Sequence, residues 1–427
     1  MFVPFPLLAF AIGLGAATEY HGEMRLQGLA YELGVAVESD GALSVDVISS
    51  WLIGAPVAPE RSGDEWRFAL PDGLGSVRAR MTDESLRGEV TLADGRVAPL
   101  ELDRVTRPPI RLQEIDVRNG DVRLGATLGL PTGAGPFPAV VFVHGGGDSS
   151  QKDAAAIFLA KYLPRFGIAC LVHDKRGCGE STGDWKTVGF EDRARDVTAC
   201  VAALKGIPEI DSRRIGLFAG SQGSWVGGVA AAMDPSIRFI VHHSGPLVSP
   251  FEADRYANAS AVRGAGLGDD VAARVDALFR LECDAIRRGI APDRDPALLA
   301  AIEVARREPW FEKSPYAATP ATHWWPKWYA LVLDHDPVPI LRRLDIPMLF
   351  LFGARDSQSD PKRNLEILGE LASRDRKDYT VHVFPGAGHG ISVPLDERGN
   401  GVAPMTMAAG YFPLLVDWIR RAARDGG

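Results

Sequence analysis

The sequence predicts an α/β protein with a doubly wound, mostly parallel sheet, a helical insertion and a separate N-terminal antiparallel β domain. Three observations predict this class. The first hundred residues contain short alternating runs broken by Asp-Gly turns. Later residues alternate apolar strands with helical patterns, and a stretch of about a hundred residues within them is mainly helical and rich in aromatics. A length of 427 residues also indicates two domains, or one large domain with additions.

The first residues predict a signal peptide over residues 1–18. The apolar run from Phe2 to Ala17 ends in small residues before a polar pair, as at a secretory cleavage site. Because no Lys or Arg precedes the run, a buried N-terminal segment is the alternative. The run is too short to cross a bilayer comfortably, and no other stretch approaches that length. We therefore expect a secreted or periplasmic protein with no integral membrane segment in the mature chain.

Residues 19–107 predict an antiparallel β domain of about six strands. Alternating runs occupy residues 33–37, 43–48, 66–70, 77–81, 86–92 and 98–102. The Asp-Gly pairs between them tolerate the positive φ of tight hairpin turns. Arg107-Pro108-Pro109 then predicts a stiff linker, since proline continues neither a helix nor a ladder. No catalytic residue types cluster here, which leaves packing, lid support and glycan or wall contact open as roles.

Residues 108–427 predict the doubly wound sheet. A hairpin comes first, with Asn119-Gly120 as its turn. Near-continuous apolar runs, typical of strands buried on both faces, follow at residues 139–143, 168–173, 215–219, 239–242, 348–352 and 380–384. Helical patterns such as residues 190–204 separate them. Ligands bind such sheets at the carboxyl ends of the strands, so the loops there are expected to carry the site.

Residues 246–340 interrupt this alternation with mainly helical, aromatic-rich sequence. An insertion at this point would lie over the strand ends as a lid. Trp324, Trp325 and Trp328 are then expected to contact an apolar part of the substrate. The alternative is that these aromatics only build the core of the insertion.

The run 215–219 leads into Gly220-Ser221-Gln222-Gly223 and then into a helix rich in small residues. A serine between such a strand and helix sits on a sharp turn with its hydroxyl exposed, which is the nucleophile elbow, G-x-S-x-G. Ala219 stands where that pattern has its first glycine. Ala219 remains small, and Ser221 is the predicted nucleophile.

A serine hydroxyl needs a neighbouring base to remove its proton. Of the nine histidines, only His389 follows the final predicted strand in a glycine-rich loop from which an imidazole can reach a central elbow. His144, His242 and His243 lie near strand ends and are reserve candidates.

The base in turn needs a buried carboxylate that holds its tautomer and stabilises its cation. Asp356 follows the run 348–352 and is the predicted acid, with Asp360 as the alternative and a surface salt bridge as the ordinary reading of Asp356. The chain order is then Ser, Asp, His, which is the order of α/β folds with this elbow.

The developing oxyanion needs backbone donors. The segment His144-Gly145-Gly146-Gly147 follows the first central strand and lacks bulky side chains after its histidine. The N–H groups of Gly146 and Gln222 are the predicted donors. A phosphate loop is disfavoured, because neither a Lys-Ser/Thr pair nor a G-x-G-x-x-G with a trailing acid is present.

These segments, with residues 174–181, 353–356 and 388–390, resemble the α/β-hydrolase superfamily over residues 110–424. The Asp174-Lys175-Arg176-Gly177 turn and the extra N-terminal domain are similar to bacterial carboxylesterases of the EstD type. The chain also resembles prolyl-oligopeptidase-like and dienelactone-hydrolase-like proteins. The resemblance implies that the 174–177 segment is a structural turn beside the site.

The expected activity is hydrolysis of a small-molecule carboxylic ester through an acyl-enzyme on Ser221, with no metal or organic cofactor. The alternatives are a serine peptidase of the prolyl-oligopeptidase-like type and a non-catalytic binding protein on the same fold. A net charge of -8 and the lack of a basic cluster argue against nucleic acid as a partner. The four cysteines show no metal-binding spacing.

Overall fold

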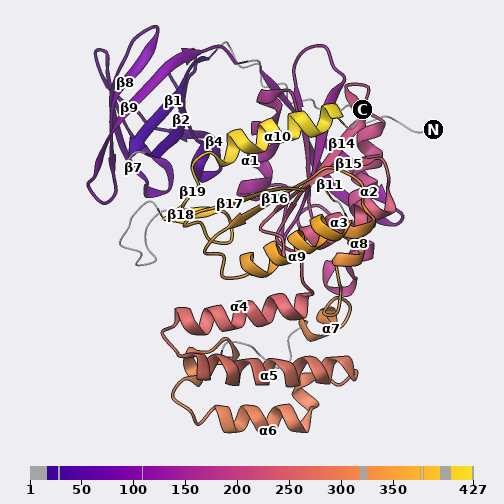
Figure 1. Cartoon of the computed structure of the whole chain (residues 1–427). Helices are drawn as coiled ribbons and strands as arrows, with labels where there is room; N and C mark the ends of the chain where they lie inside the picture. The colour runs from indigo at the N-terminus through magenta and orange to yellow at the C-terminus, as the bar shows by residue number, and fades with distance from the viewer. Residues whose placement is uncertain are drawn as a thin grey trace, which may run out of the picture.

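The structure is a computed structural model that describes residues 17–26, 29–107, 109–317, 325–375, 377, 379–394 and 405–425. It contains two large sheets, one in an N-terminal domain and one in a C-terminal domain, and a helical insertion below the second (Figure 1). The predicted signal peptide lies outside the described residues up to residue 16.

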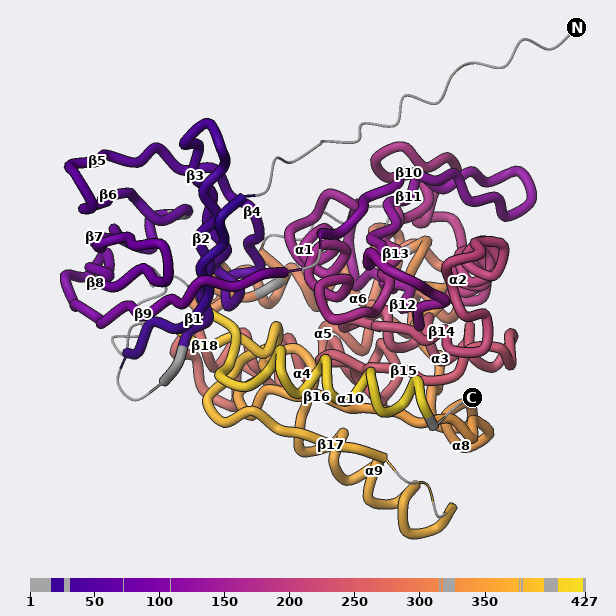
Figure 2. The backbone as a smooth tube through the Cα atoms, turned by 90° about the horizontal axis from the view of Figure 1, so that it is seen from above, coloured from indigo at the N-terminus to yellow at the C-terminus, as the bar shows by residue number. Residues whose placement is uncertain are grey.

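The N-terminal domain is one antiparallel sheet of nine strands in the order β4-β3-β2-β1-β9-β8-β7-β6-β5. Figure 2 shows these strands curling around an interior beside the C-terminal domain. One side chain in two points into this interior, where the domain has its own apolar core. The strands are β1 (Thr18–Leu26), β2 (Leu29–Val37), β3 (Leu43–Val47), β4 (Leu52–Val57), β5 (Glu60–Ser62), β6 (Glu65–Leu70), β7 (Gly75–Met81), β8 (Ser85–Leu92) and β9 (Val97–Val105).

Each of the six predicted runs forms a strand, but the sheet also contains β1, β4 and β5. β1 places Tyr20, Met24 and Leu26 on its buried face, but Gly22 interrupts this row and weakens the apolar signal. β4 contains Gly54 and Pro56, residues that weaken strands but are tolerated at a sheet edge such as this one. β5 has three exposed residues at the opposite edge and therefore no apolar signal.

The C-terminal domain contains an eight-stranded sheet in the order β10-β11-β13-β12-β14-β15-β16-β17. The strands from β12 to β17 run parallel, whereas β10 and β11 form an antiparallel hairpin. Gly120 in its turn has φ +57, which confirms the Asn119-Gly120 prediction. The strands are β10 (Ile110–Asn119), β11 (Val122–Pro131), β12 (Phe137–Val143), β13 (Ala169–His173), β14 (Ile210–Gly220), β15 (Ile237–His243), β16 (Met348–Gly353) and β17 (Tyr379–Phe384).

Helices cover both faces of this sheet, as the apolar strands require. α1 (Ala154–Tyr162) and α10 (Tyr411–Asp425) cover one face (Figure 1). α2 (Phe190–Lys205), α3 (Gly223–Met233), α8 (Val338–Arg343) and α9 (Pro361–Asp375) cover the other. Alternate residues of the central strands β12 to β16 enter the two cores. These five strands are therefore buried on both sides, and their polar residues lie at or beyond their ends.

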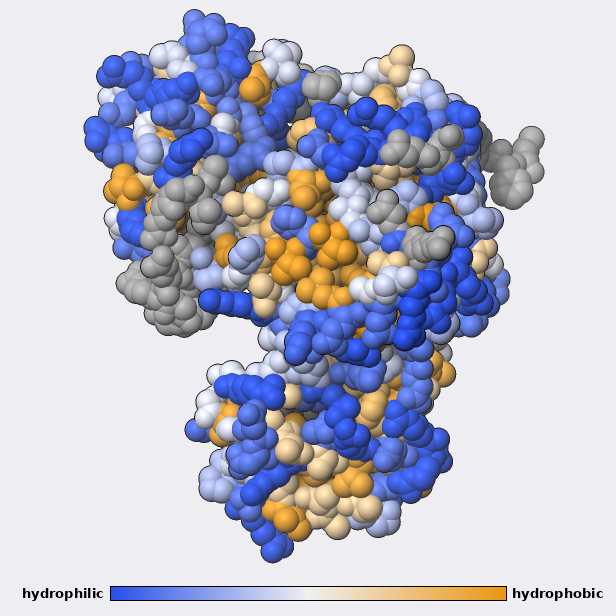
Figure 3. Space-filling view, viewed as in Figure 1, coloured by the Kyte–Doolittle hydropathy of each residue, from blue (hydrophilic) through white to orange (hydrophobic). Residues whose placement is uncertain are grey.

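The helical insertion follows β15. Its helices α4 (Pro250–Gly264), α5 (Asp269–Arg287) and α6 (Pro296–Ala305) stack as a separate layer with a small core of their own. α7 (Trp325–Tyr329) leads back toward the sheet. Figure 3 shows that the insertion protrudes from the body and that its surface in this view mixes hydrophilic and hydrophobic residues.

The N-terminal domain enters the C-terminal domain through one short segment between β3 and β4. Ile48 there is fully buried in the core formed by α1 and α10. The ring of Trp51 packs edge-on against Phe158 of α1 and Phe412 of α10, at centroid distances of 5.2 and 5.1 Å. Trp51 adopts φ 59, a conformation in which a bulky side chain is strained, so the surrounding contacts must hold it.

Candidate active site

Ser221 stands on a sharp turn between β14 and α3. Its backbone adopts φ 50, which is rare for a residue with a side chain and is held by a hydrogen bond from its N–H to the carbonyl of His243, 2.8 Å away. The turn is tight, because a Cβ on Gly223 would lie 2.4 Å from the carbonyl oxygen of Val143. The local sequence therefore folds as the predicted elbow.

Ala219 is accommodated by a glycine in the helix above it. A Cβ on Gly227 of α3 would lie 3.1 Å from the Ala219 Cβ, so the missing side chain at 227 provides the space that the extra methyl group at 219 needs. The departure from G-x-S-x-G at residue 219 is thus matched by a glycine in the helix that follows the motif.

Ser221, His389 and Asp356 form a hydrogen-bonded row. The Nε2 of His389 lies 2.9 Å from the Ser221 Oγ. Its Nδ1 lies 2.9 and 3.0 Å from the two carboxylate oxygens of Asp356. The three residues follow β14, β17 and β16, so the parallel strands bring their carboxyl ends to one edge. This arrangement suits a nucleophile, a base and a group that orients the base.

The carboxylate of Asp356 is buried and held by its own loop. Its Oδ1 accepts hydrogen bonds from the N–H groups of Gln358 and Ser359, at 2.8 and 2.9 Å. The hydroxyl of Tyr256 in α4 donates to the Asp356 carbonyl at 2.8 Å, which places the insertion at the border of the site. No sequence signal indicated Tyr256, because it lies a hundred positions from its partner.

The candidate oxyanion donors lie on either side of the elbow. Gly146 is exposed in the loop after β12, and a Cβ on its neighbour Gly145 would lie 3.5 Å from the Ser221 Cβ. Gln222 follows the serine directly. Neither the Gly146 nor the Gln222 N–H donates a hydrogen bond to another group in the described parts of the chain. Both amides therefore remain available to a ligand.

The reserve histidines have other partners or surroundings. His144 contacts the carbonyl of His173 through its Nε2, and burial holds its pKa well below its usual range. His242 stacks on Phe350, and His243 is bonded to the hydroxyl of Tyr411 at 2.7 Å. Burial lowers the pKa of both His242 and His243 to about 3. These imidazoles stay neutral near neutral pH.

Asp360, the alternative acid, lies at the start of α9. Its carboxylate accepts hydrogen bonds from the N–H groups of Lys362 and Arg363, at 3.0 and 3.2 Å. Asp360 is therefore a helix-capping residue, whereas the contact with His389 is made by Asp356.

The three tryptophans are placed unequally. Trp324 lies outside the described residues, and Trp325 is placed only as part of α7. Trp328 is 1% exposed, and its ring packs against Trp185 at a centroid distance of 5.5 Å. Trp328 is therefore a core residue of the C-terminal domain.

Within the described ranges, no group of three or more His, Cys, Asp or Glu side chains is arranged to hold a metal ion. In the same ranges, no helix is both long enough and apolar enough to cross a membrane.

A model of the alpha/beta hydrolase family matches residues 140–404, which include all three residues of the row. The chain belongs to this family. The match covers the sheet from β12 onward together with the insertion, and it agrees with the resemblance seen in the motifs.

The chain is similar to known esterases. It is 26% identical to "Esterase EstD" of Thermotoga maritima over 357 residues, which is 79% of this chain and 76% of that protein. It is 32% identical to "Esterase FrsA" of Enterobacter sp. over 155 residues, 36% of each. An esterase structure from Pyrococcus furiosus aligns with 74% of this chain and 90% of its own at 16% identity, with a TM-score of 0.44. The family match identifies an alpha/beta hydrolase, and both sequence relatives are named as esterases.

Proposed function

We propose that this hydrolase cleaves small-molecule carboxylic esters through an acyl-enzyme on Ser221. The observation that carries the proposal is the row from the Ser221 Oγ through His389 to Asp356, with 2.9 Å between the serine oxygen and the imidazole. In this mechanism His389 takes the serine proton as the oxygen attacks the ester carbonyl, and then gives it to the departing alcohol.

The second half of the reaction uses the same groups. A water molecule loses a proton to His389, attacks the acyl carbonyl, and the proton returns to Ser221 as the acid departs. Asp356 keeps the imidazole oriented and stabilises its cation in both halves. The N–H groups of Gly146 and Gln222 donate to the negative oxygen of each tetrahedral intermediate.

A fluorophosphonate probe tests the nucleophile. We expect the native protein to be labelled with one equivalent and Ser221→Ala to remain unlabelled. Ser224→Ala is a matched control, because its hydroxyl lies one turn further on and donates to the carbonyl of Ala219. If the native protein is not labelled, or if Ser221→Ala is labelled equally well, the proposed mechanism is wrong.

Panels of acyl esters and aminoacyl amides, assayed side by side, test the substrate class. We expect ester hydrolysis that Ser221→Ala abolishes, and little or no amide cleavage. Faster cleavage of the amides would instead identify a peptidase.

We also propose export to the periplasm or medium, on the strength of the apolar run at residues 2–17. Expression with and without residues 1–18, followed by cell fractionation, tests it. Equal amounts of both forms in the cytoplasm would contradict it.

A further inference from the structure

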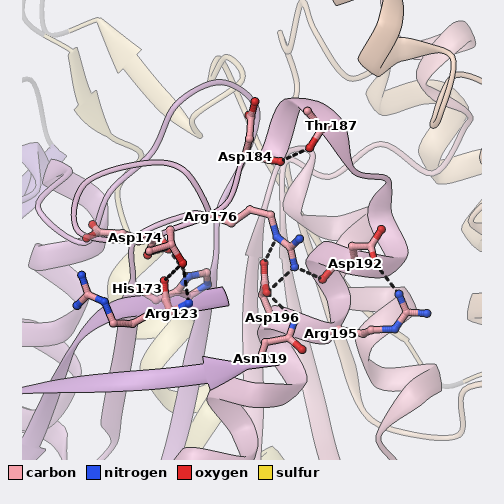
Figure 4. A network of polar contacts seen from close by, with 12 residues as sticks. Asn119, Arg123, His173, Asp174, Arg176, Asp184, Thr187, Asp192, Arg195 and Asp196 are labelled. Carbon is pink, nitrogen blue, oxygen red and sulfur yellow. Dashed lines mark hydrogen bonds and ion pairs between the residues drawn. The ribbon is translucent and has the colours of Figure 1, made fainter. Parts of the chain in front are cut away.

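Two basic side chains are buried in contact with the segments that carry the candidate oxyanion donors. Lys175 is 3% exposed and Arg193 is 5% exposed. Neither forms an ion pair with a carboxylate within the described residues. Their neighbour Arg176 differs, because its guanidinium pairs with Asp196 through two hydrogen bonds of 2.7 Å (Figure 4). Burying a cation without a paired carboxylate is costly, so the contacts of Lys175 and Arg193 need an explanation.

Lys175 holds the loop that carries Gly146. Its Nζ donates to the carbonyl of Gly145 at 2.7 Å and to the carbonyl of Gly147. The same Nζ lies 4.8 Å from the centre of the Trp185 ring. One side chain therefore binds the main chain on both sides of Gly146.

The contact with Gly145 also fixes the direction of the Gly146 N–H. The carbonyl of residue 145 and the amide of residue 146 belong to one planar peptide group, in which C=O and N–H point in opposite directions. A donor that holds the carbonyl thereby holds the N–H on the other side. Binding at the carbonyl also polarises the peptide, which strengthens the N–H as a donor.

Arg193 contacts Gln222, the residue that carries the second candidate oxyanion donor. Its Nη1 donates to the side-chain carbonyl of Gln222 at 2.5 Å. The amide nitrogen of the same side chain lies 3.9 Å from the place where a Cβ on Gly146 would stand. Arg193 thus restrains the residue after the nucleophile and keeps it next to the glycine loop.

We propose that Lys175 and Arg193 are positioning residues for the oxyanion hole. Lys175 holds the glycine loop, where it orients and polarises the 145–146 peptide, and Arg193 holds Gln222. This inference rests on the proposed function. Neither residue needs to touch the substrate, and each acts through a backbone amide that does.

The hydrogen bonds from Lys175 to the glycine loop do not require a permanent charge on its side chain. Burial lowers the pKa of Lys175 to about 6. A neutral amine still carries two N–H groups, one for each carbonyl. Replacing the side chain, rather than changing the pH, is therefore the informative experiment.

The test compares Lys175→Met with Arg176→Met, a neighbouring buried cation that contacts α2 instead of the glycine loop. Each variant is assayed for kcat and KM with a p-nitrophenyl ester, for thermal stability, and for affinity toward a boronic acid. A boronic acid forms a tetrahedral anion on a serine and so reports on oxyanion binding. We expect Lys175→Met to lower kcat and boronic acid affinity by about 10- to 100-fold, less than the loss of a direct donor, with KM little changed.

Arg176→Met should lose stability, because it leaves the buried Asp196 without its cationic partner, yet keep the kcat and boronic acid affinity of the folded protein. Arg193→Met removes the second proposed positioning residue and should lower kcat and boronic acid affinity together.

A Lys175→Met protein that folds and retains both kcat and boronic acid affinity overturns the inference, as does an Arg193→Met protein with the same properties. If Lys175→Met does not fold, Arg193→Met decides alone. Failure of the proposed function looks different: the native protein itself would then neither be labelled by a fluorophosphonate nor hydrolyse an ester, and the inference would fall with it.

Discussion

The two sheets of this protein differ in where their polar residues can gather. In the N-terminal sheet, strands such as β6 and β9 alternate buried and exposed residues, so polar side chains are spread over an outer face. In the C-terminal sheet, strands such as β13 and β16 are buried throughout, and their polar residues gather at and beyond the ends of the strands. Because those strands run parallel, their ends meet at one edge. The residues of the candidate site gather at one edge because the strands are parallel, and not because this sheet has more polar residues.

The same comparison predicts that changes at the parallel strand ends affect catalysis, whereas equivalent changes in the N-terminal sheet affect stability alone. The exception is the segment around Trp51, where one domain enters the core of the other. The following variants separate these cases.

Asp356→Asn should have the largest effect. An amide cannot stabilise the imidazolium and favours the wrong tautomer of His389, so we expect kcat to fall by about 10⁴-fold with the fold intact. Steady-state kinetics and circular dichroism measure this. Asp360→Asn is the matched control, since asparagine also caps helices, and its kcat should stay near that of the native protein. Comparable losses in both variants would contradict the assignment of the acid.

A pair of glycine variants compares the two sheets directly. A Cβ at Gly353 would lie 2.2 Å from the carbonyl oxygen of Gly388, and one at Gly88 would lie 2.2 Å from that of Arg78. The clashes are equal, but only the first displaces the loop of His389. We expect Gly353→Ala to lower kcat by about 10²-fold, as small misplacements of catalytic groups do. Gly88→Ala should lower the melting temperature without changing the kcat of the folded protein. An unchanged kcat in Gly353→Ala together with a lowered kcat in Gly88→Ala would contradict the comparison.

Trp51→Ala tests the junction between the domains. Removing a ring packed between α1 and α10 should cost about 3 kcal/mol of unfolding free energy. The ring also lies 6.4 Å from that of His243, whose carbonyl holds the Ser221 N–H, so a modest fall in kcat should accompany it. Denaturant unfolding and ester hydrolysis measure both quantities.

Trp66→Ala is the control for Trp51→Ala, because Trp66 is buried only within the N-terminal core. It should destabilise the N-terminal domain and leave kcat unchanged. If both variants affect hydrolysis equally, Trp51 has no special role.

The smallest effect is expected in the insertion. Burial raises the pKa of Asp254 in α4 to about 6, whereas the pKa of an aspartate in the unfolded chain is about 4. The folded state therefore binds the proton more tightly. The stability that this contributes is fully present below about pH 4 and is lost as the pH rises through about 6.

Asp254→Asn should remove this dependence, so the variant should melt higher than the native protein at pH 8 and lose that advantage near pH 4. Glu303→Gln on exposed α6 is the control and should show no pH-dependent difference. Melting curves from pH 4 to pH 8 measure both variants. An Asp254→Asn advantage that is the same at every pH would contradict the prediction.

Much of this organisation follows from short-range sequence patterns. Apolar runs identify the buried strands because burial on both faces leaves no polar position, and a residue just after such a run must lie at the sheet edge. This is why Ser221, Asp356 and His389 could be selected before their distances were known.

What the sequence could not predict are contacts between distant positions. Tyr256 and Asp356 are a hundred residues apart, and Trp51 meets Phe412 from the opposite end of the chain. Lys175 belongs to a recognisable turn, but nothing in that turn indicates that its Nζ binds the glycine loop. Trp328 shows the converse limit, because aromatic content alone does not separate a substrate contact from a core residue.

The central claim is that Ser221 carries the acyl group during turnover. Mixing the protein with a slowly hydrolysed p-nitrophenyl ester, quenching with acid and mapping the adduct by tandem mass spectrometry tests it directly. The account predicts one acyl group on the peptide that contains Ser221, and none in Ser221→Ala. An acyl group on any other residue, or turnover of the ester by Ser221→Ala at the native rate, would contradict it.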